Sequence, residues 1–252
     1  MEVSLLWRLG PALLCSTCLA GCVLASRPSV TPDGRAIVRI VFVGDSLIHR
    51  SQADHEFLTR IQQELERAFP EGAFDVVDAG VNGNRIADIH DRLQRDVLDL
   101  RPAAVVLYWD SDVSDVDEDD MSPAERRTTR TAYSLALEDV LARLVSSHAH
   151  VIVSGPTLLG ERPHGRNPKD RQADAYRRIN HQLAARFGAT YIDTRHAFQS
   201  SRPGGAPVAA DRGLLTEDGE HLNEQGTRVA AGAFVRALEG WLHRRRAAAT
   251  GP

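Results

Sequence analysis

The chain has 252 residues, of which 42% are hydrophobic and 25% are charged, and its formal net charge is −4. This length and composition are those of an ordinary globular protein that can bury a sizeable core. The basic residues are scattered rather than clustered, which argues against a nucleic-acid-binding protein. All three cysteines lie in the first 22 residues, so the rest of the chain has no internal disulfide, no cysteine-based zinc site and no cysteine nucleophile.

The first 25 residues are typical of a targeting segment. An apolar stretch at residues 9–25 follows Arg8 and is short for a membrane-spanning helix, which needs about 20 residues. The run Leu-Ala-Gly-Cys at 19–22 resembles a bacterial lipoprotein signal, in which Cys22 is lipidated and becomes the new amino terminus. A plain secretory signal cleaved near Ala25 and an uncleaved anchor are the alternatives. We therefore expect an exported protein, either secreted or periplasmic, or held on a membrane through its N-terminus.

Beyond this segment, residues 26–36 carry Pro, Gly and Ser and predict a linker. Five apolar runs then predict strands, at residues 37–43, 74–77, 103–109, 151–153 and 190–192. Between and after them, apolar residues at helical spacing predict helices at 55–69, at 86–100, behind the capping box Ser122-Pro123-Ala124-Glu125, around 176–187, and from about Asn223 through Leu242.

This alternation of strands and helices predicts an α/β fold. Right-handed crossovers make a three-layer α/β/α sandwich with a doubly wound, parallel, five-stranded sheet the default architecture. We place one domain at residues 37–245, followed by a tail at 246–252, and we find neither an internal repeat nor a second domain. In such a sheet, ligands bind in the loops that follow the carboxyl ends of the strands.

The first of these loops begins with Gly44-Asp45-Ser46, directly after a buried strand. A sharp turn there lifts the Ser46 hydroxyl out at the strand's end, so Ser46 is a candidate nucleophile, which needs a base and an orienting acid. Late in the chain, Asp218 precedes His221 by three residues, just before the last helix. An aspartate at this spacing can fold back and hold the imidazole. The sequence thus contains the parts of a catalytic triad.

With these motifs the chain resembles the SGNH (GDSL-type) hydrolases over residues 37–242. Gly44-Asp45-Ser46-Leu47 matches the first block of that family, Asp78-x-Gly80-x-x-Gly83 corresponds to the second, and Asp218 to Asn223 with Gly226 matches the last. The resemblance implies a carboxylic ester hydrolase with Ser46 as nucleophile, His221 as general base and Asp218 as its partner. It also implies that the backbone N–H groups of Ser46 and Gly83 donate to the oxyanion.

The third block departs from the family pattern Gly-x-Asn-Asp and reads Trp109-Asp110-Ser111-Asp112. The family's asparagine donates a third oxyanion hydrogen bond, and here Ser111 stands in its place. Losing one such donor typically costs about 100- to 1000-fold in turnover. The carboxylates on either side of Ser111 disfavour an oxyanion unless they point away or pair, and Arg85 is a candidate partner.

We expect no cofactor and no metal. The acidic run at 112–120 lacks the glycine and the terminal glutamate of an EF-hand loop and is interpreted as a solvated loop. The substrate is expected to be a short acyl ester, an acetylated sugar or a lysophospholipid, and the polar loop at 157–170 favours the first two. We expect a monomer without a nucleic-acid partner. The alternatives are a binding protein whose catalysis has weakened and a glycan O-acyltransferase.

Overall fold

The computed structural model describes residues 30–49, 57–157, 159–201 and 211–250. Its elements are, in chain order, β1 (Ile37–Gly44), α1 (Ser46–His49), α2 (Phe57–Ala68), β2 (Ala73–Gly80), α3 (Ile86–Asp96), the 3₁₀ helix η2 (Leu98–Leu100), β3 (Ala104–Tyr108), α4 (Ser111–Ser114), α5 (Pro123–Ser146), β4 (His150–Ser154), α6 (Asp170–Arg186), β5 (Thr190–Ile192), α7 (Thr194–Ser200) and α8 (Glu224–Thr250).

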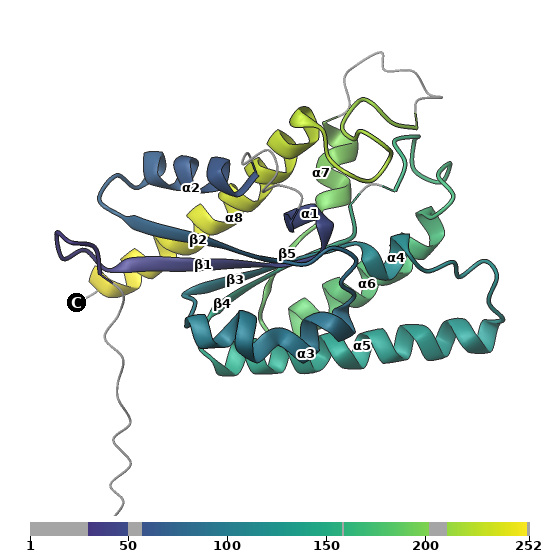
Figure 1. The fold of residues 1–252 in the computed structure, drawn as a ribbon, viewed down its shortest axis with the longest axis horizontal. Coiled ribbons are helices and arrows are strands. Elements are labelled where there is room, and N and C mark those ends of the chain that lie inside the picture. The colour runs from purple at the N-terminus through teal and green to yellow at the C-terminus, as the bar shows by residue number, and fades with distance from the viewer. Residues whose placement is uncertain (1–29, 50–56, 158, 202–210, 251–252) are drawn as a thin grey trace, which may run out of the picture.

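The five strands form one all-parallel sheet in the order β2-β1-β3-β4-β5 (Figure 1). The predicted α/β/α fold with a doubly wound, five-stranded sheet is therefore confirmed. The strand order reverses direction at β1, which lies between β2 and β3. This switch point is where ligands bind in open α/β sheets, and a single residue, Asp45, separates Ser46 from the end of β1.

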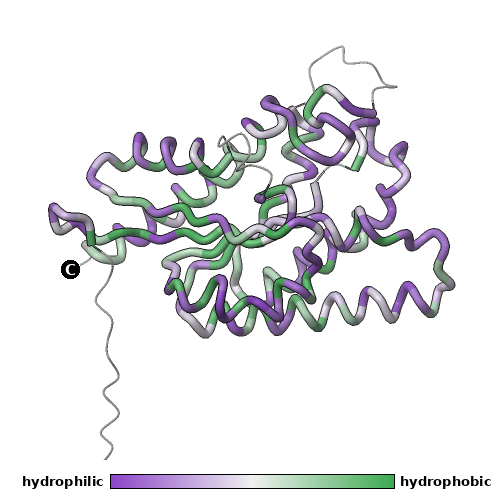
Figure 2. Tube along the Cα trace, in the orientation of Figure 1, coloured by the Kyte–Doolittle hydropathy of each residue, from purple (hydrophilic) through white to green (hydrophobic). Residues whose placement is uncertain are grey.

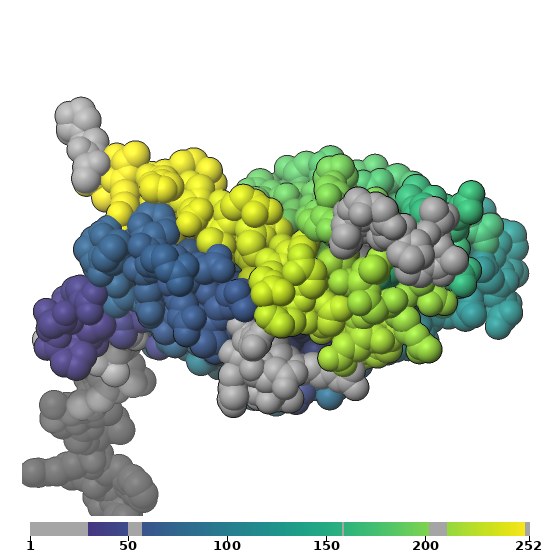
Figure 3. Space-filling view, turned by 90° about the horizontal axis from the view of Figure 1, so that it is seen from above, coloured from purple at the N-terminus to yellow at the C-terminus, as the bar shows by residue number. Residues whose placement is uncertain are grey.

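Alternation along the strands divides the hydrophobic core into two layers. On one face of the sheet, Val41, Val105 and Val151 pack with α3, α5 and α6. On the other face, Ile40 and Val106 pack with α1, α2, α7 and α8, and Figure 3 shows α2 and α8 side by side over this face. Residues 40–43 of β1 and 104–108 of β3 are fully buried, and Figure 2 shows the hydrophobic character of these strands. Both faces of the sheet are thus covered, as continuous apolar strands require.

The structure differs from the sequence prediction at several element ends. The stripe predicted as one helix at 86–100 is α3 followed by η2, because the backbone leaves the helical region at Val97 (φ −128°, ψ −61°). Strand β2 extends to Gly80 rather than residue 77. The short helices α1, α4 and α7 were not predicted, because four to seven residues give too little periodicity to read.

The ends of the predicted domain are described only in part. Residues 1–29, which include the targeting segment and Cys22, lie outside the described residues, as do 50–56 at the start of the helix predicted at 55–69. Residues 30–36, predicted as linker, form a turn in which Val30 and Ala36 make an antiparallel bridge. Helix α8 continues to Thr250, so the predicted boundary at residue 245 falls inside a helix. Within the described part of the chain, no helix is long and apolar enough to cross a membrane.

Candidate active site

Ser46 stands at the first position of α1, one residue beyond the turn that ends β1. Gly44 of β1 lies in register with Gly80 of β2, at the carboxyl end of the sheet. A Cβ atom on Gly80 would lie 2.7 Å from the backbone nitrogen of His49, so only glycine lets α1 pack this closely on β2. The serine hydroxyl is thereby held at the end of the strand where the sequence placed it.

The structure brings the three predicted triad residues together. The Ser46 Oγ lies 3.1 Å from His221 Nε2, and His221 Nδ1 lies 2.7 Å from Asp218 Oδ2. With its hydrogen on Nδ1, the imidazole donates to Asp218 and leaves Nε2 free to accept the hydroxyl proton of Ser46. This is the hydrogen-bond pattern of a serine nucleophile, its general base and an orienting acid.

Asp218 is held as a carboxylate by the turn that carries it. Partial burial works to raise its pKa, but the His221 side chain and the backbone N–H groups of His221 and Glu220 donate to it and lower the pKa to about 2. Its Oδ1 accepts the N–H of His221 at 2.8 Å and that of Glu220 at 3.0 Å. The three-residue spacing of Asp218 and His221 thus closes one turn whose backbone fixes the carboxylate.

The two predicted backbone donors lie in the loops after β1 and β2. Among the residues that the structure describes, no hydrogen-bond acceptor is assigned to the N–H of Ser46 or of Gly83. Gly83 has a φ of +70°, a conformation that side chains other than glycine rarely adopt. Both N–H groups are thus available, and their role as oxyanion donors stays a prediction.

Ser111 is placed differently from a third donor that points at the substrate. Its hydroxyl donates to Asp45 Oδ2 at 2.7 Å, and the backbone N–H groups of Ser111 and Asp110 donate to the same oxygen at 2.8 and 2.7 Å. The buried Asp45 carboxylate therefore ties the loop after β3 to the loop after β1. In this arrangement the Ser111 hydroxyl proton makes a hydrogen bond within the protein.

The carboxyl groups of the two aspartates beside Ser111 also have hydrogen-bond partners within the protein. Asp110 accepts the N–H and the hydroxyl of Thr157, and burial together with the charge of Asp45 raises its pKa to about 8. Asp112 accepts the N–H of Ile86 at 2.7 Å and the indole N–H of Trp109 at 2.8 Å. These two donors hold Asp112, and the positive charge of Arg85, the candidate partner, also acts on this carboxyl, whose pKa burial raises to about 6.

Comparison with models of protein families identifies the family of this chain. The model of the GDSL-like lipase/acylhydrolase family matches residues 42–229, a range that contains Ser46, Gly83, Asp218 and His221. The chain belongs to the GDSL-like lipase/acylhydrolase family. As a member of this family it is an enzyme that hydrolyses ester bonds.

Similar proteins agree with this assignment. The acetylxylan esterase of Geobacillus stearothermophilus is 23% identical over 213 residues, which cover 79% of this chain and 93% of that protein. The structure of the acetyl xylan esterase AlAXEase matches with a TM-score of 0.70 and 27% identity, over 79% of this chain and 99% of that one. The structure of Axe2, the acetylxylan esterase of G. stearothermophilus, matches with a TM-score of 0.66 and 24% identity, over 79% of this chain and 92% of its own.

In this GDSL-like acylhydrolase, Arg92 supports the site, although the sequence did not predict a role for it. Its guanidinium donates to the carbonyl of Gly44 at 3.0 Å, to that of Ala79 at 2.7 Å and to the Asn84 side chain at 2.5 Å. One arginine on α3 thereby links the ends of β1 and β2 to the loop that carries Gly83. Its partners are backbone carbonyls and a loop amide, which leave no spacing signal in the sequence.

Glu161 is a second support that the sequence did not reveal. Its side chain is buried and accepts hydrogen bonds from the backbone N–H groups of Leu214, Leu215 and Thr216 at 2.8, 2.9 and 2.6 Å, and from the Thr216 hydroxyl. This carboxylate binds the loop after β4 to the segment that leads into Asp218. It therefore fixes the approach of the His221 turn to the end of the sheet.

Proposed function

We propose that this acylhydrolase is an exported serine esterase that acts through an acyl-enzyme on Ser46. The observation that carries the proposal is the continuous chain from Ser46 Oγ through the His221 ring to Asp218, with links of 3.1 and 2.7 Å. Both distances lie within the range at which a general base takes a proton. The targeting segment at residues 1–25 supports export, with Cys22 as the proposed attachment to a membrane, and the enzyme is proposed to work as a monomer.

The reaction follows from the placement of these groups. Ser46 Oγ attacks the ester carbonyl carbon while His221 Nε2 takes the hydroxyl proton, and Asp218 stabilises the imidazolium that forms. The N–H groups of Ser46 and Gly83 stabilise the negative charge on the carbonyl oxygen. When the bond to the alcohol oxygen breaks, His221 returns the proton to that oxygen. Water, deprotonated by His221, then releases the acid and restores Ser46.

We propose acetylated carbohydrates as the substrate class. Similar proteins named as acetylxylan esterases support this choice, as does the polar character of the loop at 157–170. A lysophospholipid would need a long apolar groove for its acyl chain, which this loop does not offer. A small acyl group on a hydroxyl-rich alcohol fits these observations better.

Hydrolysis of p-nitrophenyl acetate by the full chain tests the proposed chemistry. Ser46→Ala and His221→Ala should each reduce kcat/KM by at least about 1000-fold, because they remove members of one catalytic unit. His196→Ala, which changes an exposed histidine on α7, is the matched control and should retain wild-type activity. Equal activity of the wild type and Ser46→Ala would refute the proposal.

A further inference from the structure

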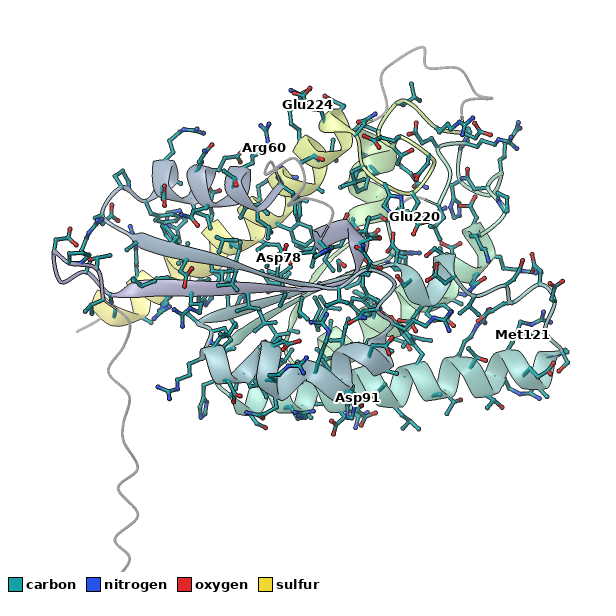
Figure 4. All side chains as sticks on the ribbon, viewed as in Figure 1. Arg60, Asp78, Asp91, Met121, Glu220 and Glu224 are labelled. Atoms are coloured by element: carbon teal, nitrogen blue, oxygen red, sulfur yellow. The ribbon has the colours of Figure 1, made fainter. Side chains whose placement is uncertain are left out.

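A cavity of about 330 Å³ borders the triad at Asp218, the partner of His221. Asp218, Gly219 and Glu220, the three residues that precede His221, line one wall of it. Ser114 at the end of α4, Lys169 before α6 and Arg212 also line it. Figure 4 shows Glu220 next to α4, at the carboxyl end of the sheet. The volume lies at the lower end of the range for small-molecule sites.

The proposed mechanism determines which half of the substrate meets this cavity, and the inference rests on that mechanism. His221 must deliver its proton to the leaving alcohol oxygen, so the alcohol lies on the His221 side of Ser46. The acyl carbonyl oxygen lies on the opposite side, toward the N–H groups of Ser46 and Gly83. A cavity bordered by residues 218–220 is therefore placed to receive the alcohol and not the acyl group.

The charged groups around the cavity are not equally available to a ligand. Lys169 donates from Nζ to the carbonyl of Val116 at 2.6 Å. Asp218 holds His221, and Asp211 is paired with Arg162 at 3.3 Å. Glu220 has its backbone N–H bound to Asp218, while its carboxylate stands next to Ser114. The Ser114 hydroxyl donates to Asp115 Oδ1 at 3.2 Å, so Ser114 Oγ and the Glu220 carboxylate are both acceptors for a substrate. The charges of His221 and Asp45 act on the Glu220 carboxyl, which therefore lies close to the triad.

We propose that this cavity is the subsite for the alcohol half of the ester and that it binds a hydroxyl-bearing glycosyl unit. Glu220 accepts a hydrogen bond from a hydroxyl of the sugar, and Ser114 makes a second polar contact. A lipid alcohol would find little to bury against, since Leu159 and Pro168 are the apolar side chains of this lining.

Two substrates with the same acetyl group and different alcohols test the subsite in the full-length protein. A mono-O-acetylated methyl β-xyloside carries free hydroxyls, whereas p-nitrophenyl acetate has a flat alcohol without them. Glu220→Ala should lower kcat/KM for the xyloside by about tenfold or more, mainly through KM, because a hydrogen bond to a charged group is lost. Activity on p-nitrophenyl acetate should fall by a clearly smaller factor than activity on the xyloside, and Glu220→Gln should recover part of the loss on the xyloside. Glu217→Ala, an exposed glutamate of the same segment, is the control.

The outcomes separate the subsite from the catalytic proposal. A Glu220→Ala enzyme that loses the same factor on both substrates, or nothing on either, would overturn the subsite while the esterase assignment stands. A shift of the pH–rate profile on p-nitrophenyl acetate would likewise show that Glu220 acts on His221 and not on the sugar. A wild type that hydrolyses neither substrate would refute the proposed function itself.

Discussion

Replacing Glu161 should disable the enzyme even though Glu161 is not a member of the triad. Its carboxylate is the acceptor for four donors of the segment 214–216, which leads into Asp218 and His221. Glu161, Leu215 and Thr216 are all at most 1% exposed. In Glu161→Ala these donors lose their acceptor in a place that water does not reach without rearrangement.

The magnitude follows from those contacts. One buried donor without a partner costs about 1–3 kcal/mol, and the costs of neighbouring donors do not simply add. We expect Glu161→Ala to lower the free energy of unfolding by about 3–5 kcal/mol, a large part of the 5–15 kcal/mol that is typical of a domain. The freed segment also misplaces His221, and a displacement of about 1 Å can reduce turnover by on the order of 100-fold. Glu161→Gln keeps one oxygen as an acceptor but places an amide NH₂ against a backbone N–H. Its stability and its kcat should therefore lie between those of the wild type and those of Glu161→Ala.

Urea unfolding and kcat on p-nitrophenyl acetate measure the two effects separately. Glu217→Ala, which alters an exposed glutamate just after the same segment, should match the wild type in both. The reasoning would be refuted if Glu161→Ala unfolded within about 1 kcal/mol of the wild type and kept its kcat, since a buried clamp is expected to cost more.

Two further predictions concern the loop after β3. Ser111→Ala should reduce kcat by less than about tenfold, because the hydroxyl donates to Asp45, and a loss of the 100- to 1000-fold order would instead identify Ser111 as an oxyanion donor. The pKa of Asp110 is about 8 in the folded chain, against an ordinary value of 3.8. The folded state therefore holds this proton more tightly than the unfolded chain does, and it loses stability as the pH rises from about 3.8 to about 8. The side chain of the Asp110→Asn variant cannot ionise. Between about pH 5 and pH 8, urea unfolding should therefore show a smaller loss of stability in this variant than in the wild type. An equal loss in both proteins would show that Asp110 is not the source of the pH dependence.

The parts of the molecule that follow a local pattern were predictable from the sequence. Continuous apolar runs predicted the strands of a parallel sheet, and the serine at the end of the first strand, Ser46, was the candidate nucleophile. The Asp218 and His221 spacing placed both side chains on one turn, which the structure shows closing through two backbone hydrogen bonds.

The supporting residues were not predictable, because their contacts join distant segments. Asp45 resembled an ordinary turn residue, yet it binds the backbone of Asp110 and Ser111, 65 and 66 positions away. Arg92 and Glu161 likewise bind backbone groups, which every residue carries and no sequence pattern marks. The direction of the Ser111 hydroxyl depends on where Asp45 stands, so only the folded chain reveals it.

The most direct test of the account is to find where a fluorophosphonate probe attaches. The full chain, labelled at neutral pH and analysed by peptide mass mapping, should carry the probe on Ser46, and His221→Ala should greatly slow labelling because the base is lost. Absence of labelling, or labelling of another residue that persists in Ser46→Ala, would contradict the central claim that Ser46 and His221 form the catalytic pair.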